Sequence, residues 1–595
     1  MHENIPTGQR ARHLPYRVLP SAIFTALPAN LCVALASDYD GTLAEDGRVS
    51  DHTVQFLQKF RRSGRKLFLV TGRVLRDLES VFSRFDLFDC IVAENGAVLY
   101  SPGTREEKAL AQPASRAFIE ALTRRGVEPL EVGETIVATR QPHETEVLEI
   151  IRNLGLELQV IFNKGAVMVL PAGVNKKFGL AAALEMFGIS EHNVVGIGDA
   201  ENDHAFLKFC EFSVAVANAH PAITEIADLN TTADDGDGVV EAVELILNNG
   251  LRSGKPERHS IPVGFDGKEE ISIPAYGSGM LISGASGSGK STFVAGFLET
   301  LFERRYQTCV IDPEGDYQSF PGAICLGDEK TAPSTEEVLQ ILQKPDSQVI
   351  ISLIGMPLGK RPEFLDELLP RLHDLRRRLG RPHWIFVDEA HHMLSPDGSP
   401  ASAVAAAQLG NLALITVHPD QIAPSVLSAI DVLIAVGPAA DEVMDAFATA
   451  AKVKAAGAGQ TKPNEHQVLA WFPKIGEVRC LDFRLSKMDR KRHKRNYAHG
   501  ELGEDRSFYF RGPEQKLNLR AHNLATFIRL AVGLDDETWL YHLNRGDYSR
   551  WIRESIKDDV LADEVHNYEE ENPGNPHKSR EGIKSAIERY YIAPA

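Results

Sequence analysis

Two short apolar runs in this chain each lead directly into a segment suited to holding phosphate. Residues 31–36 precede the segment Asp38–Thr42 (DYDGT), and residues 280–282 precede the glycine-rich loop Gly284–Ser291. A polar segment that follows a buried strand lies at the carboxyl edge of an open α/β sheet, where such sheets bind ligands. The sequence therefore predicts two α/β domains, each with a phosphate site at one edge of its sheet.

The length of 595 residues predicts several domains. Over residues 31–249, short β-like runs alternate with helical stretches, the pattern of a parallel sheet with helices on both faces. A second α/β region is expected at 261–483, after a polar segment at 250–260 that reads as a flexible linker. Capped amphipathic stretches in 484–595 predict a mostly α-helical C-terminal region, and residues 1–30 are expected to form a loose tail.

Charge and cysteine content narrow the class of protein. A formal net charge of −18 argues against binding nucleic acid over the whole surface, although the basic run at 490–495 keeps a local contact open. The six scattered cysteines lack metal-ligand spacing and are typical of reduced thiols in the cytoplasm. No apolar stretch reaches the roughly 18 residues of a membrane span, so we expect a cytoplasmic protein without membrane contact.

The first phosphate segment carries two acids with distinct expected roles. Asp38 follows the apolar run directly and is the candidate nucleophile. Asp40 points the same way and can protonate a leaving oxygen and then deprotonate water. Thr71 ends the next apolar run with a hydroxyl suited to a phosphoryl oxygen. Its neighbour Arg73 has two interpretations, a substrate contact or a structural ion pair.

Two later segments supply a cation and further carboxylates. Lys176 follows a Pro-Ala-Gly-Val-Asn turn, and Asp199 and Asp203 follow the apolar run at 194–197. Carboxylate oxygens suit Mg²⁺, a hard cation that takes oxygen ligands. Together with Asp38 and Asp40, these residues predict a magnesium-dependent site for phosphoryl transfer.

The four segments, in this order, resemble the haloacid dehalogenase superfamily over about residues 31–249. Residues 94–97 (ENGA), Asn218-Ala219 and Ala227-Asp228 resemble its Cof-type subfamily. The resemblance implies a Rossmann-like α/β domain with a short α+β cap at about 98–172, close to the phosphoglycolate phosphatases and sucrose-phosphatase-like members. It also implies a small phosphorylated substrate, such as phosphoglycolate or a sugar phosphate.

The same resemblance implies roles for individual residues. Asp38 would form an aspartyl-phosphate, Asp40 would act as acid and base, and Thr71 and Lys176 would clamp the phosphoryl group. The expected magnesium ligands are Asp38, the Asp40 carbonyl and Asp199, with Asp203 in support.

The second phosphate segment matches the full pattern G-x-x-x-x-G-K-[ST] between a strand-like run and a helix-like stretch. The N–H groups of such a loop cradle the phosphates of ATP. Lys290 would reach the β- and γ-phosphates, and Ser291 would ligate Mg²⁺. The residues expected to bind the nucleotide are Gly284, Gly287, Gly289, Lys290, Ser291, Thr292 and Asp388.

The apolar run Trp384–Val387 ends in two acids that complete this second site. Asp388 would support the Mg²⁺ ion, and Glu389 would polarise the attacking water. Thr416 and His418 end another apolar run and are candidate sensors of the γ-phosphate.

Two segments of the central region resemble the HerA/FtsK-type pumping ATPases over about residues 261–480. They are Ile311–Tyr317 (IDPEGDY) and Asp388–His392 (DEAHH). The resemblance implies a RecA-like P-loop core that commonly works as a ring on DNA or protein. It also implies an arginine from a neighbouring subunit, for which the candidates are Arg371, Arg376, Arg377, Arg378 and Arg381.

Three functions fit these observations. The first is a Mg²⁺-dependent phosphomonoester hydrolase fused to an ATP-hydrolysing module that regulates or assembles it. The second is an oligomeric ATPase motor acting on DNA or protein, with the phosphatase as an accessory. The third is a scaffold or signalling protein whose state ATP binding sets. The acidic composition disfavours the motor, so the expected partners are a small phosphorylated substrate, ATP and further copies in a ring.

Overall fold

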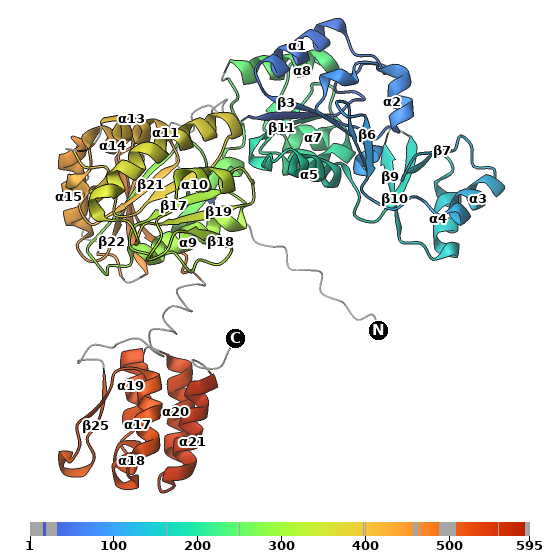
Figure 1. Ribbon diagram of the computed structural model, residues 1–595. Helices are drawn as coiled ribbons and strands as arrows, with labels where there is room; N and C mark the ends of the chain where they lie inside the picture. The colour runs from blue at the N-terminus through green and yellow to red at the C-terminus, as the bar shows by residue number, and fades with distance from the viewer. Residues whose placement is uncertain are drawn as a thin grey trace. The chain divides into compact units, whose positions relative to one another are not determined.

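The fold is that of a computed structural model, which divides into two compact units, Met1–Arg484 and Leu485–Ala595 (Figure 1). The basic run at 490–495 lies outside the described residues. The structure describes residues 16–18, 32–163, 165–248, 250–396, 398, 400–455, 462–464, 466–486, 507–556 and 558–589.

The N-terminal domain is built on an eight-stranded sheet in the order β13-β12-β11-β2-β3-β4-β5-β6. Its central strands are parallel, and β5 and β6 pair antiparallel at one edge. The strands are β2 (Ala34–Ser37), β3 (Lys66–Val70), β4 (Cys90–Ala93), β5 (Val98–Ser101), β6 (Glu106–Ala109), β11 (Val194–Gly198), β12 (Phe212–Ala215) and β13 (Leu229–Asn230). The helices are α1 (Asp51–Arg62), α2 (Leu75–Val81), α5 (Lys176–Met186), α6 (His204–Phe209), α7 (Pro221–Ile226) and α8 (Asp235–Leu247).

A small cap is inserted between β6 and α5 (Figure 1). Its antiparallel sheet has the order β7-β8-β10-β9. The cap was expected to begin at about residue 98, but β5 and β6 extend the core sheet because β5 turns back on β4 as an antiparallel neighbour. The cap elements are α3 (Arg116–Arg124), β7 (Glu131–Val132), β8 (Val137–Arg140), α4 (Glu144–Leu154), β9 (Leu158–Asn163) and β10 (Ala166–Pro171).

The central domain holds a twelve-stranded sheet in the order β1-β15-β14-β24-β23-β22-β16-β21-β20-β17-β19-β18. The strands from β22 to β18 in this order pair in parallel, as the alternating sequence pattern predicts. The strands are β14 (Ser260–Asp266), β15 (Glu269–Pro274), β16 (Gly279–Ser283), β17 (Thr308–Asp312), β18 (Ala323–Leu326), β19 (Gln348–Ser352), β20 (Trp384–Val387), β21 (Leu412–Thr416), β22 (Val432–Val436), β23 (Gln467–Phe472) and β24 (Glu477–Asp482). The helices are α9 (Lys290–Glu303), α10 (Thr335–Leu342), α11 (Arg361–Leu379), α12 (Ala390–Met393), α13 (Pro400–Leu409), α14 (Pro424–Leu427) and α15 (Ala440–Ala451).

The first strand of this sheet corrects the expectation for residues 1–30. Residues Tyr16–Val18 form β1 and pair in parallel with β15. These three residues therefore belong to the edge of the central sheet and not to a loose tail.

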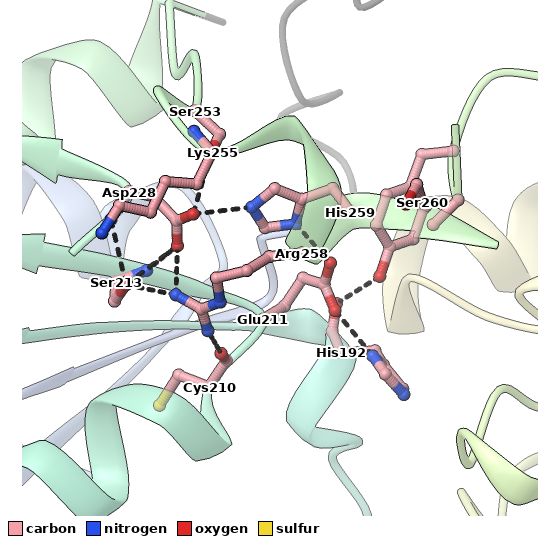
Figure 2. Close-up of polar contacts among 12 residues, drawn as sticks. His192, Cys210, Glu211, Ser213, Asp228, Ser253, Lys255, Arg258, His259 and Ser260 are labelled. Atoms are coloured by element: carbon pink, nitrogen blue, oxygen red, sulfur yellow. Dashed lines mark hydrogen bonds and ion pairs between the residues drawn. The ribbon is translucent and has the colours of Figure 1, made fainter. Parts of the chain in front are cut away.

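The segment 250–260 is not a flexible linker, because its polar side chains bind buried acids of the N-terminal domain (Figure 2). Ser253 and Arg258 donate to the carboxylate of Asp228 at 2.8 and 2.6 Å. His259 hydrogen-bonds with Asp228 at 2.9 Å and with Glu211 at 2.7 Å. The polar side chains of this segment were expected to be solvated, but several of them bind the carboxylates of Asp228 and Glu211.

The C-terminal end of α9 and the segment before β20 complete this junction. The ring of His192 stacks on that of Tyr306 at 3.9 Å, and its Nε2 hydrogen-bonds with the Arg304 carbonyl at 2.7 Å. Arg381 donates to the Gly188 carbonyl at 2.6 Å. His192 precedes β11 and Arg381 precedes β20, whereas Asp199 follows β11 and Asp388 follows β20. Each five- or four-residue strand spans roughly 13–17 Å, so each site lies about one strand length from the junction.

The C-terminal unit is mostly helical, as expected, with one short hairpin. Aromatic side chains fill its core, where the indole of Trp539 donates to the Ser579 hydroxyl at 2.9 Å. Its elements are β25 (Phe508–Phe510), β26 (Leu519–Ala521), α17 (Leu524–Gly533), α18 (Asp536–Leu543), α19 (Asp547–Trp551), α20 (Asp559–Glu571) and α21 (Pro576–Ile587). Among the described helices of the whole chain, none is long and apolar enough to cross a membrane.

Candidate phosphate sites

A buried lysine joins the first and last acidic segments of the N-terminal domain. Lys176 begins α5, and its Nζ donates to Oδ1 of Asp38 and Oδ1 of Asp203, both at 2.6 Å. All three side chains are buried. Burial and the charge of Asp203 raise the pKa of Asp38, and Lys176 opposes them. Burial alone would lower the pKa of Lys176, but the two carboxylates outweigh it and raise that pKa.

The carboxylates at this sheet edge are held in place by short loops. Oδ2 of Asp203 accepts the backbone N–H groups of Asp199 and Ala200, both at 2.9 Å. Asp199 accepts the Thr42 hydroxyl at 3.1 Å. One oxygen from each of Asp38, Asp199 and Asp203 lies within 4.8 Å of the others. Three acids with one lysine leave negative charge on oxygen ligands, which fits a hard divalent cation.

Arg73 makes one of its two predicted contacts, the ion pair, and it also lines the cavity described below. Its guanidinium donates to both carboxylate oxygens of Asp40, at 2.8 and 2.7 Å, and also binds Asp77. Arg73 therefore forms an ion pair that holds the carboxylate of Asp40. The hydroxyl of Thr71 is fully buried at the end of β3 and accepts the Arg73 backbone N–H at 3.1 Å.

A cavity of about 480 Å³ lies between this group and the cap. Asp38, Asp40 and Lys176 line its core side. The residues that line it from the cap and its connecting strands are Pro129, Glu131, Ile136, Ala138, Thr139, Arg140, Asn163, Ala166 and Met168.

Glu94 connects the core to the cap, a contact that the sequence did not predict. Its buried carboxylate accepts the backbone N–H groups of Glu134, Thr135 and Ile136, at 2.8, 2.8 and 2.9 Å. These amides directly precede β8, so the core holds the cap through one side chain. The only sequence feature that marks this position is the ENGA segment, in which Glu94 has a left-handed φ of 51°.

In the central domain, the glycine-rich loop joins β16 to α9 as predicted. Gly287 and Gly289 adopt φ values of 73° and 103°, which favour glycine. A Cβ on Gly284 would lie 2.3 Å from the Val436 carbonyl, so only glycine fits there. Lys290 begins α9, and its Nζ donates to the Gly284 and Ala285 carbonyls, both at 3.0 Å. Ser291 and Thr292 follow in the first turn of the helix.

Four acids gather around this lysine. Asp388 and Glu389 directly follow β20, and Glu314 and Asp316 come from the loop after β17. Burial lowers the pKa of Lys290, and the four acids oppose that shift. Burial and the neighbouring acids raise the pKa of Asp388 to about 8.

Asp316 belongs to the IDPEGDY segment, and the sequence predicted no individual role for it. The hydroxyl of Ser291 donates to its carboxylate at 2.8 Å. Asp312 shapes the loop by accepting the backbone N–H groups of Gly315, Asp316 and Tyr317.

The remaining candidates in this domain divide into two groups. The hydroxyl of Thr416 hydrogen-bonds with the His391 ring at 3.0 Å and accepts the His418 backbone N–H at 3.0 Å, so all three lie at one sheet edge. Arg376 and Arg381 are buried on backbone carbonyls of their own domain and its neighbour. These two arginines cannot reach a site in another subunit.

Two family models match separate parts of the chain. The family model described as haloacid dehalogenase-like hydrolase matches residues 35–142 and 131–243. The model described as Helicase HerA, central domain, matches residues 253–367.

Individual relatives align with the N-terminal domain. A phosphoglycolate phosphatase of Methanothermobacter thermautotrophicus is 33% identical over 224 residues, which cover 36% of this chain and 98% of that protein. Phosphoglycolate phosphatase 2 of Saccharolobus solfataricus is 30% identical over 228 residues, covering 36% of this chain and 93% of that protein. A solved haloacid dehalogenase-like hydrolase from Bacteroides thetaiotaomicron is 19% identical with a TM-score of 0.32, covering 36% of this chain and 98% of that one.

Proposed function

The chain belongs to the haloacid dehalogenase-like hydrolase family through its N-terminal domain, and we propose that this domain hydrolyses a small phosphomonoester by way of an aspartyl-phosphate. The observation that carries the proposal is the buried group of Asp38, Lys176 and Asp203, which borders a cavity that the cap covers. The names of the relatives make phosphoglycolate the first substrate to test, with sugar phosphates second.

Each side chain at this site has a separate proposed role in the hydrolysis reaction. A carboxylate oxygen of Asp38 attacks the phosphorus, and the bond from phosphorus to the leaving oxygen breaks. Asp40 gives a proton to that oxygen and later takes one from the water that hydrolyses the aspartyl-phosphate. Lys176 orients Asp38 and balances charge on the transferred group, and the Thr71 hydroxyl offers a second contact. Arg73 holds the carboxylate of Asp40 in position for both proton transfers.

A magnesium ion fits the carboxylates of Asp38 and Asp199, with Asp203 holding the loop that carries Asp199. The backbone carbonyl of Asp40 completes the expected set. When bound, Mg²⁺ would stabilise the negative charge of the transferred phosphoryl group. Lys176 contacts Asp38 directly, so the lysine and a bound metal would both offset the negative charge at this site.

Phosphate release tests this proposal. The full chain should release phosphate from phosphoglycolate with Mg²⁺, and a chelator should stop the release. Asp38→Asn should abolish turnover while the protein stays folded. Turnover by Asp38→Asn at a substantial fraction of the normal rate would overturn the mechanism.

The HerA-like central domain supports a second activity, the binding and hydrolysis of ATP. The supporting observation is the glycine-rich loop at the start of α9, with Lys290 surrounded by acids. The loop N–H groups and Lys290 would hold the phosphates, Ser291 and Asp388 would hold Mg²⁺, and Glu389 would orient the attacking water.

Two experiments can distinguish between the alternative roles of the proposed ATPase. We favour a module that assembles or modestly regulates the phosphatase, and the alternative is a motor that acts on DNA or protein in a ring. Light scattering with a non-hydrolysable ATP analogue measures ring assembly. Stimulation of ATP hydrolysis by DNA would favour the motor, and its absence would favour the regulatory module.

A further inference from the structure

Two groups of side chains in the described part of the chain bring three possible metal ligands together. In each group, one ligand atom from each residue lies within 4.8 Å of the others. The first group, already considered for Mg²⁺, is Asp38, Asp199 and Asp203. The second group, directly after β20 in the central domain, is Glu389, His391 and His392. The proposed hydrolysis of ATP uses Glu389 but gives neither histidine a role.

The two groups offer different donor atoms. Three carboxylates suit Mg²⁺, which takes oxygen ligands and keeps several waters. One carboxylate and two imidazoles suit Zn²⁺ and other divalent transition metals, because imidazole nitrogen binds these ions well. Two histidines and one glutamate also occur as the protein ligands of zinc sites that leave one coordination position open. The second group is therefore expected to prefer a transition metal to Mg²⁺.

His391 is the buried member of the second group, and a neighbour orients its ring. The Thr416 hydroxyl hydrogen-bonds with Nδ1 at 3.0 Å, which leaves Nε2 as the ring nitrogen available to a metal. A polar partner on one nitrogen is the usual means of orienting a histidine that binds a metal through the other. Burial, with smaller contributions from His392 and His418, lowers the pKa of His391 to about 4, so its ring is neutral near pH 7.

Glu389 and His392 lie beside this ring. Oε2 of Glu389 is 3.3 Å from Nδ1 of His391, and the ring of His392 is centred 4.0 Å from that of His391. The side chain of Glu389 is partly buried, and His392 is exposed. Ligand atoms about 2.0–2.2 Å from a zinc ion lie roughly 3.3–3.6 Å apart in a tetrahedron, so rotations of these two side chains can close the set around an ion.

The charges around Glu389 favour a further cation. Glu389 is one of four acids that surround Lys290. Since several carboxylates face one ammonium group, a divalent cation at Glu389 is attracted by its surroundings, and more strongly in a partly buried site than in water.

We propose that Glu389, His391 and His392 bind a divalent transition metal ion such as Zn²⁺, and that the bound ion inhibits ATP hydrolysis by holding Glu389 away from the attacking water. The metal site follows from the three side chains alone. Its inhibitory effect rests on the proposed ATPase function, in which Glu389 orients that water.

Zinc binding tests the site directly. The full chain, freed of metals and supplied with excess Mg²⁺ but no nucleotide, is titrated with Zn²⁺ in competition with a fluorescent zinc indicator. His392→Gln should raise the dissociation constant of one zinc ion by about 10- to 100-fold or more, because loss of a residue that merely supports a metal ligand already weakens a site that much. His466→Gln, which changes an exposed histidine of the same domain, is the matched control and should leave binding unchanged. Equal zinc affinity of the wild type and His392→Gln would overturn the proposal.

ATP hydrolysis tests the effect of the ion. Without Zn²⁺, His392→Gln should hydrolyse ATP within about threefold of the wild-type rate, as expected for a substitution of an exposed residue. With Zn²⁺, this variant should need about 10- to 100-fold more of the ion for half inhibition. Equal inhibition of the two proteins would show that Zn²⁺ acts elsewhere, for example by replacing Mg²⁺ at the phosphates, and would overturn the inhibitory role.

The two measurements separate this inference from the proposed ATPase. If the wild type binds Zn²⁺ and His392→Gln does not, while neither protein hydrolyses ATP, the metal site stands and the ATPase proposal fails. If both proteins hydrolyse ATP and bind Zn²⁺ with equal affinity, the ATPase stands and the metal site fails.

Discussion

The two candidate phosphate sites of this chain each centre on one lysine, but the two lysines make different direct contacts. Lys176 in the N-terminal domain is buried between two carboxylates, which raise its pKa. Lys290 in the central domain donates to two backbone carbonyls of its own loop, and burial lowers its pKa.

The difference indicates how each site prepares for its ligand. In the N-terminal domain, side chains from three separate segments are already assembled around Lys176, so the site is built into the fold. In the central domain, four acids surround one lysine, and burial together with the neighbouring acids raises the pKa of Asp388. We predict that the proposed nucleotide and its metal would change the charge balance of this site when they bind.

The largest expected effect separates the two activities. Asp38→Asn removes the proposed nucleophile and should lower phosphoester hydrolysis by about 10³-fold or more. ATP hydrolysis by the same variant should be unchanged, because Asp38 lies at the edge of a different sheet. Parallel assays on one preparation check both rates, and a joint loss would contradict the separation of the sites.

The reverse variant acts on the other site. Glu389→Gln should keep ATP binding but lower ATP hydrolysis by about 10²- to 10⁴-fold, because the water loses its orienting acid. Nucleotide affinity by fluorescence titration and turnover by phosphate release give the two readouts. Normal turnover in this variant would remove Glu389 from the mechanism.

Stability distinguishes the two lysines directly. In chelator, Lys176→Met leaves Asp38 and Asp203 buried without their cation, which should lower the free energy of unfolding by about 3–5 kcal/mol. Lys290→Met is the matched variant and should change it by about 1 kcal/mol or less, since Lys290 donates to two carbonyls and, among the described residues, interacts with its neighbouring acids without a close ion pair. Urea unfolding measures both, and equal losses would show that the two sites are built alike.

The junction between the domains predicts a smaller, pH-dependent effect. Burial lowers the pKa of His259, but hydrogen bonds to Asp228 and Glu211 outweigh burial and raise it to about 9. Arg258 on the same segment and His192 across Glu211 are the other charged groups at this cluster. The unfolded value of about 6.5 is lower, so the stabilisation is complete below pH 6.5 and is lost as the pH rises through 9.

Glu211 determines the acidic pH at which the stabilisation by this cluster is lost. Its two histidine partners outweigh burial and lower its pKa to about 2, so its contribution is lost only as the pH falls from about 4.5 toward 2. As the pH rises from 6.5 to 9, the free energy of unfolding should therefore decrease by about 1–3 kcal/mol, which unfolding midpoints would report. His259→Gln should flatten this profile, and His52→Gln, an exposed histidine on α1, should not.

The sequence predicted that the candidate site residues would lie together, because residues that follow parallel strands meet at one edge of a sheet. Asp38 and Asp199 each follow a buried strand, and parallel strands bring their carboxyl ends to one edge. The glycine-rich loop was identified in the same way, from its position between β16 and α9.

Contacts between separate segments were beyond that reasoning. Two such contacts are the ion pair of Arg73 with Asp40 and the hydrogen bonds of Glu94 to the cap. Both depend on how separate loops meet in space, which the spacing of residues in the sequence does not determine. The segment 250–260 was misread as a linker because a polar composition does not reveal whether its partners are water or the buried Asp228.

The central claim is that Asp38 and Lys290 serve two separate phosphate sites on one chain. Phosphate release from phosphoglycolate with Mg²⁺ and without ATP, compared among the wild type, Asp38→Asn and Lys290→Ala, tests it most directly. We predict that Asp38→Asn releases no phosphate and that Lys290→Ala releases it at nearly the wild-type rate. Release by Asp38→Asn, or its loss in a folded Lys290→Ala protein, would contradict the account.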